Sequence, residues 1–178
     1  MNENNSWFKV VAPHFDNIVI GEIYGNSENV VGRKIAYGAS ELKEIKPRVG
    51  YKLIFRIVSV SESECKAELD SLILSREQIS RLVRHSVSKM DVVVPVTIED
   101  KPYAIKILCA ISKTQNKYKK AIKVEIKNFI EGEVKESKLK DVFIGAMTNK
   151  TQNGLHKKLN KIYPTRIAEV RAIEPRKL

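Results

Sequence analysis

Residues 103–127, YAIKILCAISKTQNKYKKAIKVEIK, contain the change of pattern that decides the fold. Up to Ile111 the stretch is a run of apolar and β-branched residues, which is typical of a strand. From Thr114 onward the apolar residues recur at helical spacing and define one face of a helix. That face consists of Tyr118, Ala121, Ile122, Ile126, Phe129 and Ile130. The chain is therefore expected to pass from strands to helices at this point.

Residues 1–112 are predicted to be mainly strands, because their apolar residues alternate with a period near two between short polar clusters. The expected strands are residues 8–12, 17–22, 31–37, 51–60, 65–74, 90–98 and 103–111. Ser75 followed by Gln78 resembles a capping box and predicts one short inserted helix, at about 76–85. The four residues 99–102 fit a hairpin loop between the last two strands.

Residues 113–163 are predicted to be helical. A second helix is expected around Leu139–Met147, and a third, carrying Leu155 and Leu159, should end before Pro164. Residues 166–173 alternate again and predict a final strand. Strands with short connections followed by helices indicate the α+β class, with an antiparallel, barrel-like sheet. At 178 residues the chain is expected to form a single domain, residues 1–178.

Positive charge is concentrated in the second half of the chain. The net charge is +11, with 13 Lys or Arg against 11 Asp or Glu in residues 1–89 and 19 against 10 in residues 90–178. A basic half on a folded chain indicates a polyanionic partner, either nucleic acid or an anionic membrane surface. The helix that begins near Thr114 should point its lysines away from its apolar face. These are Lys117, Lys119, Lys120, Lys123 and Lys127, with Lys113 just before them.

Two interpretations of that lysine face are open. A solvated surface is the ordinary explanation of a charged helix face. Lys119, Lys123 and Lys127, however, follow one another at four-residue spacing, where like charges repel by a few tenths of a kcal/mol per pair. A phosphate backbone would favour this arrangement. The short helix adds Arg76, Arg81 and Arg84, whose planar guanidinium groups suit phosphates, with Lys89 just beyond.

Several other classes of protein are not supported by the sequence. The N-terminal MNENNSWFKVVAP does not have the pattern of an export signal, and no apolar run approaches the roughly 18 residues of a membrane span. Cys65 and Cys109 are interpreted as reduced, packed thiols, and neither has a second ligand at metal-binding spacing. The three histidines fall in different segments, and no phosphate loop or nucleophile motif is present. We therefore expect no enzymatic activity, metal, cofactor or small-molecule substrate.

Several segments, in this order, resemble the archaeal and eukaryotic small-subunit ribosomal protein family called S-one-e or S-three-a-e. They are SWFKVVAPHF, IGE, VGR, LSREQISRLVRHSVSKMD and KIYPTRIAEVR. The resemblance implies a non-catalytic, cytoplasmic ribosomal component that binds small-subunit rRNA on the platform near the mRNA exit. It also implies contacts with neighbouring platform proteins, and leaves contact with mRNA near the exit open. It adds Arg33, Arg166 and Arg171 to the expected RNA-binding residues.

Two further hypotheses remain beside this one. A freestanding barrel-type RNA-binding protein outside the ribosome would present aromatic side chains on a sheet face, and Trp7 and Phe8 beside Lys9 are candidates. A membrane-surface role is less well supported, because the face opposite the lysines lacks the Trp-rich apolar stripe of an interfacial helix.

Overall fold

The predicted alternation of side chains is clearest in strand β4 (Tyr51–Val60). Every second residue from Tyr51 to Ile57 is buried, and the residues between them are exposed or half-buried. One face of β4 therefore packs on the core while the other meets solvent, as is common in antiparallel sheets. Strand β7 (Lys101–Ile111) differs, because its last five residues, 107–111, are all buried. Both faces of β7 are covered at this end.

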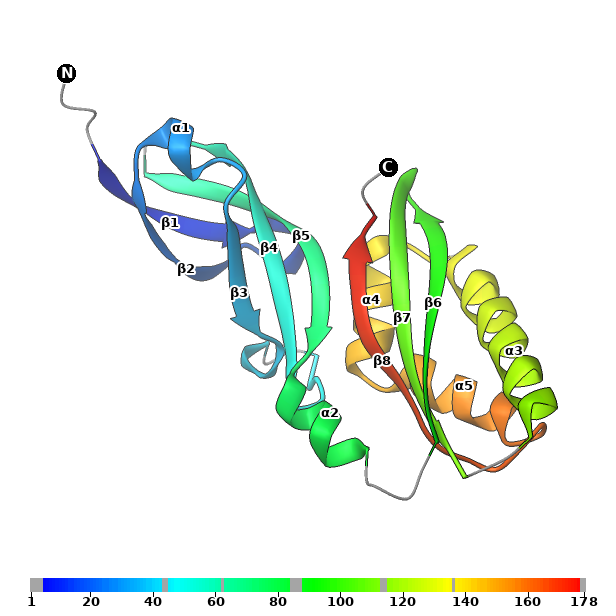
Figure 1. The fold of residues 1–178 in the computed structure, drawn as a ribbon. Helices are drawn as coiled ribbons and strands as arrows, with labels where there is room; N and C mark the ends of the chain where they lie inside the picture. Colours follow the sequence, from blue (N-terminus) through cyan, green and yellow to red (C-terminus); the bar gives the residue numbers. More distant parts are fainter. Residues whose placement is uncertain are drawn as a thin grey trace.

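The computed structural model describes residues 5–42, 45–61, 63–83, 88–112, 115–135 and 137–176 (Figure 1). The other strands in this part of the chain are β1 (Ser6–Ala12), β2 (Ile18–Gly25), β3 (Lys34–Gly38), β5 (Glu64–Leu74), β6 (Ser88–Ile98) and β8 (Thr165–Pro175). The helices are α1 (Ser27–Val30), α2 (Arg76–Leu82), α3 (Asn116–Lys135), α4 (Leu139–Met147) and α5 (Lys150–Leu159), with single 3-10 turns at Pro13–Phe15 and Ala39–Glu41. The protein is thus of mixed α and β structure.

Strand β5 joins the two halves of the sheet. The strands run in the order β2-β1-β5-β8-β7-β6, and β4 pairs with β5 and then with β3. On one edge, β5 pairs with β1 near its start and with β8 at Leu72 and Ile73 near its end. Among the described strands this order is open, so the barrel-like closure stays a prediction.

The structure corrects the sequence-based prediction in several places. The β6–β7 connection is a two-residue turn, not a four-residue loop: Glu99 and Asp100 both have positive φ, as in a type I′ hairpin, and Pro102 lies within β7. The sheet is not wholly antiparallel, because β1 runs parallel to β5. Residues 31–33 precede strand β3, and the one-turn helix α1 lies just before them. Helix α2 ends at Leu82, and the rest of its predicted length lies partly outside the described residues.

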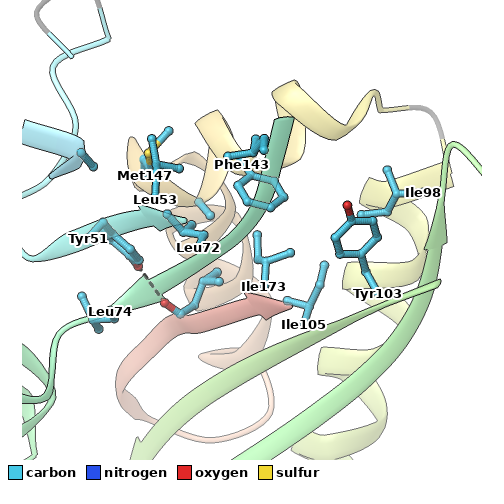
Figure 2. Close-up of a cluster of buried hydrophobic side chains, with 14 of the residues drawn as sticks. Tyr51, Leu53, Leu72, Leu74, Ile98, Tyr103, Ile105, Phe143, Met147 and Ile173 are labelled. Atoms are coloured by element: carbon cyan, nitrogen blue, oxygen red, sulfur yellow. Dashed lines mark hydrogen bonds between the residues drawn. The ribbon is translucent and has the colours of Figure 1, made fainter. Parts of the chain in front are cut away.

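The helices after β7 cover one face of strands β6, β7 and β8 (Figure 1). Helix α4 also reaches the N-terminal strands. Figure 2 shows Phe143 and Met147 of α4 among the side chains of Leu53, Leu72 and Ile173, all of which are buried. The hydrophobic core is therefore continuous between the two halves of the sheet.

A buried polar cluster lies at the same junction. The Glu169 carboxylate, only 4% exposed, receives hydrogen bonds from Arg48 Nη1 (2.6 Å) and Tyr51 Oη (2.7 Å). Gln152 Nε2 of α5 donates to Tyr51 Oη (3.0 Å) and to the carbonyl oxygen of Ala146 (2.6 Å). Burial, followed by the negative charge of Glu169, raises the pKa of the Tyr51 phenol. These bonds tie β4 to β8 and α5.

A second ion pair holds strands β3, β4 and β5 together. The buried Asp70 carboxylate on β5 accepts hydrogen bonds from Lys34 Nζ (2.7 Å) and Arg56 Nε (2.9 Å). Burial on its own would raise the pKa of Asp70, but the hydrogen bonds and positive charges of Lys34 and Arg56 outweigh it and lower the pKa. Asp70 is therefore ionised in the folded protein at neutral pH.

This ion pair predicts a pH dependence of stability. Because the folded pKa of Asp70 is below its unfolded value of about 3.9, its contribution is complete above about pH 5 and is lost as the pH falls through the folded pKa. We expect Asp70→Asn to lower the free energy of unfolding at pH 7 by about 1.5–3 kcal/mol, the range for a charged hydrogen bond. Urea unfolding at pH 7 and pH 3 should show the difference between variant and wild type shrinking at the lower pH. A difference that is independent of pH would contradict this assignment.

Candidate nucleic-acid interface

Helix α3 lies along β6 and buries a stripe of side chains at four-residue spacing. Ile122, Ile126, Ile130 and Val134 are buried. Successive members of such a stripe are rotated by about 40°, so the buried face winds slowly around the helix. The buried face predicted from the sequence differs from this stripe in three residues. Tyr118 and Ala121 are exposed, and Phe129 is only half-buried.

The lysines of α3 mostly point to solvent. Lys117, Lys120, Lys123 and Lys127 are exposed, as predicted. Lys119 is half-buried, so it is less accessible than these four lysines. Lys113 lies outside the described residues. Lys123 and Lys127 line a shallow groove of about 260 Å³ beside Asp91–Val93 of β6.

Lys89 and Arg171 approach this groove but already have an acidic partner. The Asp91 carboxylate lies 3.6 Å from Lys89 Nζ and 3.7 Å from Arg171 Nη1. Arg171 is also half-buried. These two residues therefore contribute less free positive charge than the exposed lysines of α3 do.

Helix α5 adds positive charge next to α3. The ammonium nitrogen of Lys158 on α5 lies 3.9 Å from a carboxylate oxygen of Glu125 on α3. The same nitrogen lies 4.9 Å from the centre of the Phe129 ring. Lys157 and Lys161 are exposed, as is the predicted residue Arg166 at the start of β8. The α5 lysines were not among the predicted RNA-binding residues. The sequence does contain a pattern that indicates them: residues 142–168 hold four lysines and one arginine but no Asp or Glu.

The start of α3 and the end of α5 are joined by two tyrosines. The Tyr118 and Tyr163 rings have their centres 5.2 Å apart and are tilted by 40°. Tyr118 is 38% exposed and Tyr163 is half-buried. We name the surface formed by the exposed cations around this pair the basic end. Its members are Lys117, Lys120, Lys123, Lys127, Lys157, Lys158, Lys161 and Arg166.

Helix α2 lies toward the same end of the molecule, the lower edge in Figure 1. The Ser75 hydroxyl caps it by accepting the backbone N–H of Gln78 (3.4 Å), which confirms that half of the predicted capping box. Arg76 and Arg81 are exposed, and Arg84 lies outside the described residues. Figure 1 places α2 on the N-terminal strands, apart from α3 and α5.

Arg33 does not join this surface. It follows helix α1, which lies near the upper edge of Figure 1. Its Nη1 donates to the carbonyl oxygen of Tyr24 (3.4 Å). The structure therefore separates Arg33 from the predicted lysines of α3, and we do not place it in the basic end.

The described residues show little that resembles a reactive centre. Within them, no group of three or more His, Cys, Asp or Glu side chains is arranged to hold a metal ion. Burial raises the pKa of the Cys109 thiol to about 12 and also raises that of Cys65, so both thiols are protonated at neutral pH. In the part of the chain with assigned positions, every helix is too short or too polar to cross a membrane.

Comparison with known proteins identifies relatives over almost the whole chain. A protein of Methanopyrus kandleri named "Small ribosomal subunit protein eS1" is 25% identical over 177 residues, covering 94% of this chain and 83% of the relative. Proteins of the same name from Desulfurococcus amylolyticus and Archaeoglobus fulgidus are 27% and 26% identical, covering 92% and 94% of this chain and 79% and 82% of the relatives. The model of the Ribosomal S3Ae family matches residues 3–177, and the chain therefore belongs to that family.

Proposed function

We propose that this protein is a structural constituent of the small ribosomal subunit that binds rRNA through the basic end and supports translation. The Ribosomal S3Ae family consists of structural ribosomal proteins, not enzymes, and the similar archaeal proteins carry a small-subunit name. The observation that carries the proposal is the basic end itself, where eight exposed cations from α3, α5, β8 and the turn after α5 outnumber the acids described beside them, Asp91 and Glu125. A polyanion is the partner that such a surface favours.

The finer location follows from the family resemblance. We place the protein on the platform of the cytoplasmic small subunit, near the mRNA exit, with rRNA and neighbouring platform proteins as its partners. Helix α2, with Arg76 and Arg81 exposed, offers a second rRNA contact toward the same end of the molecule. The proposal includes no small-molecule substrate and no membrane contact. We further propose that residues 1–178 act as one ribosomal-protein domain, since β5 and α4 connect its two halves.

The exposed cations indicate that phosphates and RNA shape set most of the affinity. Lysine ammonium groups are point charges that hold phosphates without reading base edges. If about five to eight phosphates are neutralised, log K should fall against log salt with a slope of about −4 to −7. A slope near zero would exclude this mode of binding.

A lysine-to-glutamine triple variant tests the location of the interface. Lys120, Lys123 and Lys127 are exposed on α3, and replacing all three by Gln keeps helix propensity nearly constant while removing repulsion along the helix. We expect unchanged or slightly higher stability, together with a salt slope flatter by about two to three. Salt titrations of rRNA binding, with thermal melts of each protein, measure both effects.

The matched control removes the same charge from the other half of the molecule. Lys9, Lys52 and Lys66 are also exposed, but they lie on β1, β4 and β5 and are not among the residues predicted to bind rRNA. We expect their replacement by Gln to leave the slope nearly unchanged. Equal flattening by the two triple variants would mean that net charge, not the basic end, determines binding.

One observation favours a freestanding RNA-binding protein instead. Trp7 and Tyr24 lie opposite each other on β1 and β2, with ring centres 5.3 Å apart and exposures of 66% and 52%. The next residue of this face, Lys9, lies between Glu22 and Glu64, so the site has little net positive charge. Co-sedimentation decides between the two functions, because a tagged protein that runs wholly apart from small subunits would exclude the ribosomal role.

A further inference from the structure

The basic end contains a pair of aromatic rings, Tyr118 and Tyr163, which a surface that binds only through charge does not require. Tyr118 lies in the first turn of α3 and exposes more than a third of its surface, although its partner Tyr163 is half-buried. A partly exposed aromatic ring with cations beside it is the arrangement that single-stranded nucleic acid uses, because bases stack on rings while phosphates pair with the cations.

The support beneath the pair is rigid. Tyr163 follows α5, and its backbone N–H donates to the carbonyl oxygen of Leu159 (3.0 Å). Two bonds from Thr165 close the loop: its backbone N–H donates to Asn160 Oδ1 (2.8 Å), and its hydroxyl donates to the carbonyl oxygen of Tyr163 (3.0 Å). Pro164 restricts the chain between them. Tyr163 is therefore held in place before any ligand binds, which lowers the entropic cost of binding.

The two segments that carry the pair hold charge of one sign. The first two turns of α3, residues 116–124, contain no acid, and neither do residues 156–168. The first acid along α3, Glu125, is already close to Lys158. Because the first turn of α3 also has no acidic residue, the positive end of its helix dipole is not offset there.

The other exposed aromatic pair provides a contrast within the same molecule. Trp7 and Tyr24 are more exposed, but Glu22 of β2 and Glu64 of β5 flank Lys9 of β1. Charge complementarity therefore favours an RNA ligand at Tyr118 and Tyr163 and not at Trp7 and Tyr24.

We propose that Tyr118, supported by Tyr163, stacks against an unpaired base of the bound RNA while Lys117, Lys161 and Arg166 hold the adjoining phosphates. This inference rests on the proposed rRNA-binding function and specifies the RNA class at the basic end: a single-stranded or bulged segment. Duplex RNA, whose bases are already stacked, uses only the cations.

The test compares two RNA probes with the full-length protein at one salt concentration. The probes are an unstructured single strand of adenines and cytidines and a perfectly paired duplex of the same length. We expect Tyr118→Leu to weaken binding of the single strand by about 5- to 150-fold, the range for loss of one stacked base, and to change duplex binding by less than about twofold. Tyr118→Trp should bind the single strand at least as tightly as wild type.

Tyr24→Leu is the matched control, because it removes the exposed tyrosine of the other aromatic pair, which joins β1 and β2. It should alter neither affinity. Equal weakening of both probes by Tyr118→Leu, or no change in either, would overturn the stacking proposal. If Tyr118→Leu melts at a lower temperature than wild type, the Tyr118→Trp variant still tests the proposal. Weaker binding of the single strand by Tyr118→Trp, with unchanged binding of the duplex, would exclude stacking. A wild-type protein that binds neither probe would overturn the proposed rRNA-binding function itself, whereas duplex binding without stacking would leave that function intact.

Discussion

Residues 1–112, expressed without the rest of the chain, should aggregate instead of giving a soluble, folded product. The truncation removes β8, α3, α4 and α5, which together cover both the β6–β7 hairpin and part of β4 and β5. In β7, residues 107–111 are all buried in the intact protein and would become exposed. Long, apolar strands without their partners are aggregation sites. The fragment would also lose the partners of Tyr51, because Gln152 and Glu169 are absent from it.

Size-exclusion chromatography and circular dichroism of the fragment measure this result directly. Residues 1–83 are the control, because this shorter fragment lacks the hairpin but keeps β1 to β5 and α2. We expect it to aggregate less than residues 1–112, since it lacks the buried stretch 107–111 of β7 that the longer fragment exposes. A monomeric, well-dispersed fragment of residues 1–112 would contradict our inference that the two halves fold as one unit.

The strands and helices could be predicted from the sequence where one face of the element is buried and the other is exposed to solvent. In β4 the alternation of buried and exposed residues directly records a sheet with one solvent face. The stripe Ile122–Ile126–Ile130 likewise records helix α3. The connection at Glu99–Asp100 was missed because neither residue is the Gly that usually marks a type I′ turn. Helix α1, at four residues, is too short to produce a periodic signal.

The long-range pairings could not be predicted from local patterns. The parallel contact between β1 and β5 joins residues 9–11 to residues 64–66, and its register depends on how the intervening strands pack. The lysines of α3 were predictable because their spacing within one helix is visible in the sequence. The basic end was not, because Tyr118 meets Tyr163 only when α5 packs against α3. Arg33, assigned by resemblance, follows helix α1, which Figure 1 shows at the opposite end of the molecule.

Phe143→Ala should be the most damaging single substitution that we propose, lowering the free energy of unfolding by about 3–5 kcal/mol. The Phe143 side chain is completely buried on α4, beside Leu72 of β5 and Ile173 of β8. Removing its ring leaves a cavity at the point where the two halves of the sheet meet, and the surrounding strands can collapse into it only partly. Because a protein of this size is stabilised by only about 5–15 kcal/mol, a large share of its stability would be lost.

Val142→Ala is the matched control on the same helix. Val142 is half-buried, so its truncation should cost only about 1 kcal/mol. Thermal melts should place Phe143→Ala about 6–20 °C below wild type, at about 2–4 °C per kcal/mol, and Val142→Ala much closer to it. Since α4 lies apart from the basic end in sequence and contributes none of its cations, the folded fraction of Phe143→Ala should keep the wild-type salt slope for RNA. If Phe143→Ala lowered the free energy of unfolding by less than about 1 kcal/mol, the two halves would be stable without α4 between them. A normal thermal melt with a flattened salt slope for RNA binding would instead show that α4 takes part in RNA binding.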